Sequence, residues 1–127
     1  GLTVAELEAT PAAPVTRAYT RHLLAVAHGG TLGETGGADL PCYWIYWEVG
    51  KRLNQTVPDD PIYATWIQAY ANPAFGTHVE QQLTLIDRLA AQASEQERLH
   101  MIDHFMHSCR YEFLFWDQAY HETTWPV

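Results

Sequence analysis

The stretch that decides the fold is SEQERLHMIDHFMHSCRYEFLFWDQAY, residues 94–120. Ser94 is followed three residues later by Glu97, the pattern of a capping box at a helix start. At about 100° per residue, the apolar side chains from Met101 to Tyr120 fall on one arc of a helical wheel, with Leu114 as the one large exception. Most charged and histidine side chains fall on the remaining arc. The stretch therefore predicts one long amphipathic helix that ends near His121.

Glu112 is the exception within this predicted helix. It falls in the middle of the apolar arc, flanked by Phe105, Ser108 and Phe115. A carboxylate among apolar side chains is costly unless it is paired or protonated, because loss of water disfavours its charge. Burial that raises the pKa toward neutrality makes such a group a candidate general acid. The alternative is a structural glutamate bonded to a neighbouring Tyr, Trp or Arg.

The rest of the chain also has a helical pattern. No segment alternates apolar and polar residues with β-branched enrichment, and no Asn-Gly or Asp-Gly hairpin signal occurs. Thr31 and Glu34 form a second capping box, followed by Gly36, Gly37 and Pro41, which predict a weak or kinked segment. The sequence predicts a single all-α domain over residues 1–127, with further helices at about 14–29, 41–54, 62–71 and 74–93.

Composition and charge exclude several classes of protein. The chain has 127 residues and a formal net charge of −8. No basic cluster is present, which argues against binding to nucleic acid or to an anionic membrane. No apolar run approaches a membrane span, and residues 1–10 are too polar for a signal peptide. We therefore expect a cytoplasmic protein in which Cys42 and Cys109 remain free thiols.

Cys42 lies in LPCYWIYWEVGKRL, residues 40–53, among aromatic side chains. On a helix it lines up with Tyr46 and Val49. A lone cysteine is commonly inert core material. The alternative interpretation is a nucleophile, because a thiol, aromatic faces and a buried acid together suit a flat heteroaromatic ligand.

Three motifs resemble those of the TenA family, the thiaminase II or aminopyrimidine aminohydrolase enzymes. They are LPCYWIYWEVGKRL at 40–53, YATWIQAYANPAF at 63–75 and CRYEFLFWDQAYHETTWP at 109–126, in the family's order and spacing. The resemblance implies a haem-oxygenase-like helical bundle, typically a homotetramer, that needs no cofactor or metal. It implies hydrolysis of 4-amino-5-aminomethyl-2-methylpyrimidine to hydroxymethylpyrimidine in thiamin salvage, with slower cleavage of thiamin itself.

The same resemblance implies roles for individual residues. Cys42 matches the nucleophile that adds to the pyrimidine ring. Glu112 matches the carboxylate that holds the pyrimidine edge and shuttles the proton. The remaining matches are aromatic residues of the substrate pocket: Tyr19, Tyr46, Tyr70 and Phe115. Phe115 lies one helical turn from Glu112 in the sequence.

The sequence departs from the family in two ways. Tyr43 follows the cysteine where the family has proline. The resemblance covers only about the last three-fifths of a family member, so we expect this chain to lack the N-terminal helices. In the family those helices carry an aspartate that binds the pyrimidine and an aromatic that stacks on it. Alone, the chain is expected to expose half of its pocket and an apolar face of the bundle.

Two other functions remain open from the sequence. His100, His104 and His107 share one helical face with Asp103 beside them, a spacing that can bind a transition metal in an oxygenase-like protein of the same fold. The same histidines also fit a solvent-exposed face, because they lie on the polar arc away from Glu112. The other alternative is a pyrimidine-binding or regulatory protein without catalysis.

Overall fold

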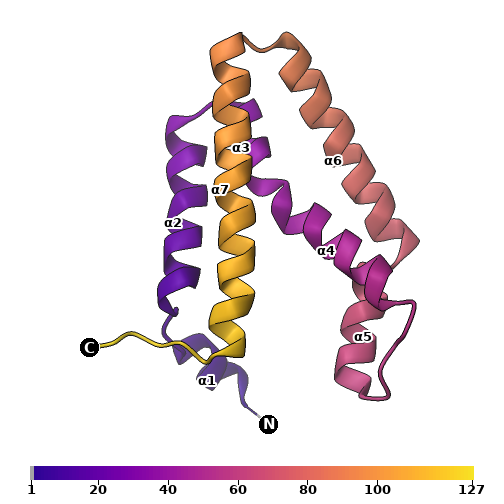
Figure 1. The fold of residues 1–127 in the computed structure, drawn as a ribbon. Coiled ribbons are helices and arrows are strands. Elements are labelled where there is room, and N and C mark those ends of the chain that lie inside the picture. The colour runs from indigo at the N-terminus through magenta and orange to yellow at the C-terminus, as the bar shows by residue number, and fades with distance from the viewer. Residues whose placement is uncertain (1) are drawn as a thin grey trace.

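The computed structural model describes residues 2–127, and every regular element in that range is an α-helix. The expected all-α fold is confirmed (Figure 1). No helix among the described residues is both long and apolar enough to cross a membrane. The helices are α1 (Val4–Ala9), α2 (Pro14–Gly29), α3 (Leu32–Asp39), α4 (Pro41–Leu53), α5 (Pro61–Tyr70), α6 (Pro73–Gln92) and α7 (Glu95–Tyr120).

The long helix α7 is the centre of the arrangement (Figure 1). α2 runs antiparallel to α7 along one side, and α3 packs against both helices. α4 leaves the end of α3 and crosses toward α5, while α6 diverges from α7 below the short turn that joins them. The side chains of α7 can therefore face α2 and α3 on one side and the α4–α6 region on the other.

A glycine allows α3 to approach α7 closely. A Cβ atom added at Gly37 would lie 2.8 Å from the carbonyl oxygen of Met101 on α7. Real Cβ atoms do not approach backbone oxygens this closely, so any larger residue would push the two helices apart. The glycines that predicted a weak helix thus serve helix packing instead.

The expected kinked segment is two separate helices. Leu40, between α3 and α4, has helical backbone angles, with φ −53° and ψ −40°. Pro41 follows it and has no N–H to continue the hydrogen-bond ladder of α3. The chain therefore changes direction at residues 40–41, and α4 starts with Cys42 in its first turn.

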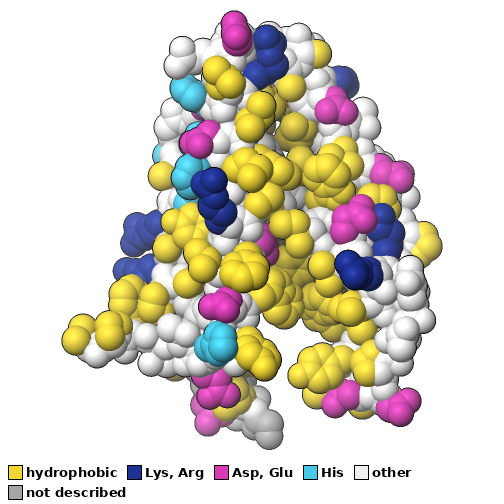
Figure 2. Space-filling model, viewed as in Figure 1, with side chains coloured by type: hydrophobic (Ala, Val, Ile, Leu, Met, Phe, Trp, Pro, Cys, Tyr) yellow, Lys and Arg dark blue, Asp and Glu magenta, His cyan; other side chains and the backbone are white. Residues whose placement is uncertain are grey.

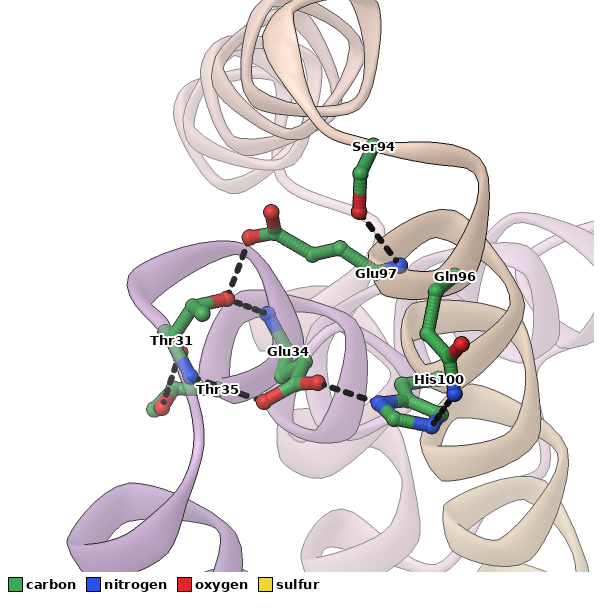
Figure 3. A network of polar contacts seen from close by, with 7 residues as sticks. All are labelled: Thr31, Glu34, Thr35, Ser94, Gln96, Glu97 and His100. Carbon is green, nitrogen blue, oxygen red and sulfur yellow. Dashed lines mark hydrogen bonds and ion pairs between the residues drawn. The ribbon is translucent and has the colours of Figure 1, made fainter.

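A polar network joins the start of α3 to the start of α7 (Figure 3). The capping box of Thr31 and Glu34 is present as predicted. The box predicted at Ser94 forms only by half: Ser94 accepts a hydrogen bond from the N–H of Glu97, but the Glu97 carboxylate instead accepts from the Thr31 hydroxyl at 2.5 Å. His100 Nδ1 lies 2.8 Å from Glu34 Oε1. The Glu97 carboxylate therefore connects α7 to the start of α3 and does not cap the start of α7.

α1 is a helix that was not predicted from the sequence. Thr3 and Glu6 form its capping box, so the local signal was present. No residue of α1 is buried. An amphipathic pattern facing a core was therefore missing, and that pattern is the stronger sign of a helix.

Large apolar side chains lie exposed on one face of the molecule. Figure 2 shows them filling the hollow between α7 and α6 and continuing toward α4 and α5. On α7, Ile102 is 59% exposed and Phe113 is 71% exposed. The expectation of an exposed apolar bundle face is confirmed. We call this surface the front apolar face; its members include Val49, Leu53, Ile62, Tyr63, Ile102, Phe113 and Trp116.

Candidate functional site

Glu112 is buried in α7, as its position on the apolar arc predicted. Its side chain faces α2 and is 2% exposed. The hydroxyl of Tyr19 on α2 donates a hydrogen bond to Glu112 Oε1 at 2.8 Å. Tyr19 is itself 8% exposed and its ring stacks on that of Tyr111, with centroids 5.4 Å apart. The carboxyl group thus has a buried hydrogen-bond donor held in place by a second aromatic ring.

Burial raises the pKa of Glu112 above its usual value. The hydroxyls of Tyr19 and Tyr46 act in the opposite direction, because a donor stabilises the ionised carboxylate. Burial and the neighbouring carboxylate also raise the pKa of Tyr19. The site therefore contains a carboxyl group that takes up a proton more readily than one in water.

A side chain from α7 holds the start of α2 in place. The N-cap residue of α2 is Ala13, which offers no side-chain hydrogen bond. Gln118, 7% exposed, replaces that cap: its Oε1 accepts from the N–H of Val15 at 2.7 Å. Its Nε2 donates to the Thr16 hydroxyl at 3.2 Å. This contact fixes the helix that carries Tyr19.

Two of the predicted pocket tyrosines meet between α4 and α5. The ring centroids of Tyr46 and Tyr70 are 5.0 Å apart, and Trp66 lies within 4.7 Å of Tyr70. A Cβ atom at Gly50 of α4 would lie 2.8 Å from the backbone carbon of Tyr70, so this glycine permits the close approach. Trp116 of α7 joins the cluster, 5.8 Å from Tyr46.

Phe115 lies at the edge of this aromatic cluster. Its ring meets that of Trp116 edge-on, with centroids 5.9 Å apart. Trp66 and Trp116 were not singled out from the sequence as pocket residues. They stand in the second and third motifs, and the density of aromatic residues there was the available signal.

Cys42 is exposed in the first turn of α4. Partial desolvation by the atoms around the sulfur raises its pKa, and the negative charges of Glu112 and Asp39 raise it further. Asp39 also accepts a hydrogen bond from Tyr43, the residue that replaces the family's proline. The thiol of Cys42 is therefore close enough to Glu112 for their charges to interact, and it is protonated at neutral pH.

Glu112 also lines a cavity of about 660 Å³ between α4, α5 and α7. This volume is within the range of sites that bind small molecules. Cys42, Tyr19, Tyr46, Tyr70 and Phe115 do not line it. The lining is mainly apolar: Ile45, Val49, Leu53, Ile62, Tyr63, Trp66, Ile67, Cys109, Glu112, Phe113 and Trp116.

The three histidines of α7 do not act as one group. His100 pairs with Glu34 at the start of α3. The rings of His104 and His107 lie instead near His22 of α2, at 5.7 and 5.9 Å between centroids. Residues 2–127 contain no group of three or more His, Cys, Asp or Glu side chains arranged to hold a metal ion. His22 of α2, which was not singled out from the sequence, thus lies with His104 and His107, while His100 is paired with Glu34.

Residues 1–122 match the model of the TENA/THI-4/PQQC family. The chain belongs to this family. It is 38% identical over 120 residues to an aminopyrimidine aminohydrolase of Bacillus subtilis, covering 94% of this chain and 51% of that protein. It is 37% identical to an aminopyrimidine aminohydrolase of Halalkalibacterium halodurans, covering 98% of this chain and 57% of the relative. The predicted resemblance is confirmed.

A solved structure of a TenA homologue from P. horikoshii OT3 has the same fold. It superposes with a TM-score of 0.84 at 26% identity, covering 94% of this chain and 55% of the solved one. The chain thus spans little more than half the length of the relatives that it matches. The helices described above reproduce a family bundle over that part.

Proposed function

We propose that this chain carries the thiol and the acid of an aminopyrimidine hydrolase of thiamin salvage. The substrate class is a 4-amino-5-aminomethylpyrimidine, in which the amine of the aminomethyl group is replaced by a hydroxyl, with thiamin as a slower substrate. The observation that supports this most is the buried Glu112 carboxyl with Tyr19 hydrogen-bonded to it. The relatives named aminopyrimidine aminohydrolase support the substrate class.

In the proposed reaction, Cys42 is the nucleophile and Glu112 transfers protons. The sulfur bonds to a ring carbon as the thiol gives up its proton, and a ring nitrogen takes up a proton. The exocyclic C–N bond then breaks, and the amine leaves as ammonia with a proton supplied at Glu112. Water adds to the exocyclic carbon and returns a proton to Glu112. The sulfur then leaves the ring, and the proton held on the ring nitrogen goes back to the thiol. Burial raises the pKa of both Cys42 and Glu112, so each group keeps its proton to a higher pH than it would in water, which suits proton transfer.

The aromatic side chains are assigned to binding. Tyr19 keeps the Glu112 carboxyl in one orientation, while Tyr46, Tyr70 and Phe115 supply flat surfaces near it. Offset or edge-on contact with such rings favours a planar heteroaromatic ligand. The apolar cavity beside Glu112 supports the same substrate class, because it offers one acid in a mainly apolar wall.

Substitution of the thiol tests the proposal. Cys42→Ser should lower the rate of ammonia release from the aminomethylpyrimidine by at least about a hundredfold, because a hydroxyl is a far weaker nucleophile than a thiol. Cys109→Ser is the matched control, since Cys109 is the other free thiol and lines the cavity beside Glu112. It should keep most of the rate. Undiminished turnover by Cys42→Ser, with the helical circular dichroism unchanged, would remove Cys42 from the mechanism.

A second function is supported by the position of Cys42. Its side chain is exposed and does not line the cavity of Glu112, which favours a protein that binds a pyrimidine without turning it over. Calorimetric titration with the aminomethylpyrimidine separates the two functions. Equal affinity of the unsubstituted protein and of Cys42→Ala, with no ammonia released by either, would favour binding alone.

We also infer that the protein works in the cytoplasm as a homo-oligomer, a tetramer. Two free thiols and no disulfide among the described residues support a reducing compartment. The front apolar face supports assembly, because exposed apolar surface of this extent is typical of an interaction site. Sedimentation of the purified protein measures the assembly directly.

A further inference from the structure

α7 carries a stripe of side chains that the rest of the described chain leaves uncovered. The residues of the stripe recur at alternating steps of three and four, the a and d positions of three consecutive heptads. Six of them are more than 40% exposed, and Cys109 is partly exposed. Such a repeat is the pattern by which one helix packs along another. We call the stripe the α7 seam; its members are Leu99, Ile102, Met106, Cys109, Phe113, Trp116 and Tyr120.

The α7 seam runs past both cavities of the front apolar face. Ile102 lines a second cavity, of about 490 Å³, between α6 and α7. Cys109, Phe113 and Trp116 line the cavity that contains Glu112. A helix laid along the seam would therefore cover both cavities at once.

The chain exposes more surface than a compact protein of its mass. Its accessible surface is 8990 Å². A folded monomer of 14.4 kDa exposes roughly 6,800 Å². The excess of roughly 2,000 Å² belongs partly to α1, which buries no residue, and partly to the front apolar face. A stable homodimer removes roughly 1,000 Å² or more from each partner, so the excess is enough for one such contact.

The front apolar face carries few charges although the chain as a whole is acidic. The formal net charge is −8. Among the residues that line the two cavities, only Asp87, Arg98 and Glu112 carry ionisable acid or base groups of this kind, and Glu112 is buried. Two acidic molecules can therefore meet at this face with little repulsion, whereas a basic partner would find no complementary patch there.

A second copy of the chain has the size and the surface that this face requires. The relatives matched above are nearly twice as long as this chain, so two copies hold about as many residues as one relative. A copy also brings its own α7 seam, so one contact covers the seams of both chains. Contacts between identical surfaces are the commonest in oligomers. These observations favour a second copy over an unrelated helical partner.

We propose that two copies of this chain pair through their α7 seams, and that the second copy closes the cavity of Glu112. The seam of each chain packs against the seam of the other across a two-fold axis. The front apolar faces of both chains are then removed from water, which drives the association.

The pairing completes the site. In the single chain, exposed side chains such as Phe113 on α7 and Ile62 on α5 leave the cavity of Glu112 open to water. The second copy supplies the missing wall, and the exclusion of water strengthens the interaction of the carboxyl group with a ligand. The value of this closure for hydrolysis rests on the proposed function; the pairing itself does not.

Cross-linking at the middle of the seam tests the pairing without a substrate. Cys109 is the central member of the seam, so a two-fold pair places it close to its counterpart in the second copy. Cys42→Ser leaves Cys109 as the only thiol, and air oxygen with copper phenanthroline should join two such chains by a disulfide. Cys109→Ser, which keeps the exposed Cys42, is the matched control. It should give at least about tenfold less covalent dimer, because a disulfide requires Cα atoms within about 7 Å.

Substitution within the seam tests which surface is used. Phe113→Glu should weaken dimerisation in sedimentation by at least about tenfold, because the pair would take a charge out of water. Leu114→Glu is the matched control, since its side chain is 40% exposed on the same helix but lies off the seam. It should associate as wild type does.

The reactivity of Cys109 with a maleimide measures closure of the cavity that it lines. In Cys42→Ser, the reaction should slow as the protein concentration rises and dimers form. Addition of Phe113→Glu should keep the reaction fast at every concentration.

A chain that sediments as a monomer throughout, equal cross-linking through Cys42 and Cys109, or equal weakening by Phe113→Glu and Leu114→Glu would overturn the pairing. A dimer in which Cys109 stays as reactive as in the monomer would overturn the closure of the cavity. Because no substrate is used, a protein that fails to release ammonia still gives these results. Absence of turnover in a correctly paired protein would count against the hydrolase function alone.

Discussion

At the scale of single residues, Glu112 is subject to two opposing effects. Burial disfavours its charge, while the hydroxyls of Tyr19 and Tyr46 favour it. Burial is the larger effect, so the folded protein binds the Glu112 proton more tightly than the unfolded chain does. This makes the group useful for proton transfer and costly for stability.

That cost predicts how Glu112→Gln changes stability with pH. Between the ordinary value of 4.5 and the raised pKa, folded wild-type protein binds more protons than unfolded, so its free energy of unfolding falls as pH rises. The neutral glutamine does not titrate. The variant should therefore gain stability relative to wild type as pH rises from 4.5, with no further gain above the raised pKa. Urea unfolding at several pH values measures the difference.

Glu6→Gln is the matched comparison for this experiment. The Thr3 backbone N–H and hydroxyl lower the pKa of Glu6, so the sign is reversed. Relative to wild type, this variant should lose stability as pH rises toward neutrality, by a small amount because the pair is exposed. The same trend for both variants would contradict the assignment of a raised pKa to Glu112.

The burial of Glu112 was predictable from the sequence, but the groups that surround it were not. A helical wheel places every residue of α7 relative to its neighbours, because helix geometry is local. The bond from Tyr19 spans 93 residues of sequence, and only the family resemblance pointed to Tyr19. Gln118 lay on the polar arc, and no pattern indicated that it would cap another helix.

At the scale of helices, α2 depends on α7 for both of its polar attachments. Gln118 caps its first turn, and Glu112 binds Tyr19 further along. Gln118→Ala should lower the free energy of unfolding by about 1–2 kcal/mol, the usual cost of losing a helix cap. Gln96→Ala, at an exposed position of the same helix, should change it by less than about 0.5 kcal/mol. Urea denaturation compares them, and equal losses would contradict the cap.

The contact between α3 and α7 depends on Gly37. Gly37→Ala should destabilise the protein by about 1–3 kcal/mol, because the new Cβ would lie 2.8 Å from a backbone oxygen that cannot move alone. Gly29→Ala is the control, since its Cβ would meet nothing within 4 Å. It should be neutral or slightly stabilising. Thermal melting distinguishes them, and a neutral Gly37→Ala would show that α3 can move away without cost.

The helices themselves were largely predictable, but the role of Glu97 was not. Thr31 with Glu34 formed the box that the sequence indicated. Glu97 instead bonds to Thr31, because the start of α3 lies beside the start of α7 and offers a hydroxyl donor there. Such a choice depends on which helix ends meet, and local sequence does not contain that information.

At the scale of the whole molecule, the bundle is covered on one side and open on the other. α2 and α3 pack against one side of α7, where Tyr19 of α2 binds Glu112. On the other side lies the front apolar face, with a second cavity of about 490 Å³ between α6 and α7. Side chains such as Ile102 and Phe113 project from α7 into water there. A surface of this kind favours association by the removal of apolar area from water.

Substitutions on this face should change association without changing the fold. Ile102→Glu combined with Phe113→Glu places two charges at positions that are already 59% and 71% exposed, so packing is not disturbed. Sedimentation of this double variant should show less self-association than that of wild type. A fluorescence assay should show that it binds less of an apolar dye. Wild-type association should rise with salt, which screens the repulsion of a net charge of −8. Val4→Glu on α1, 71% exposed but outside the face, should behave as wild type. Equal association of all three proteins would mean that the front apolar face takes no part in assembly.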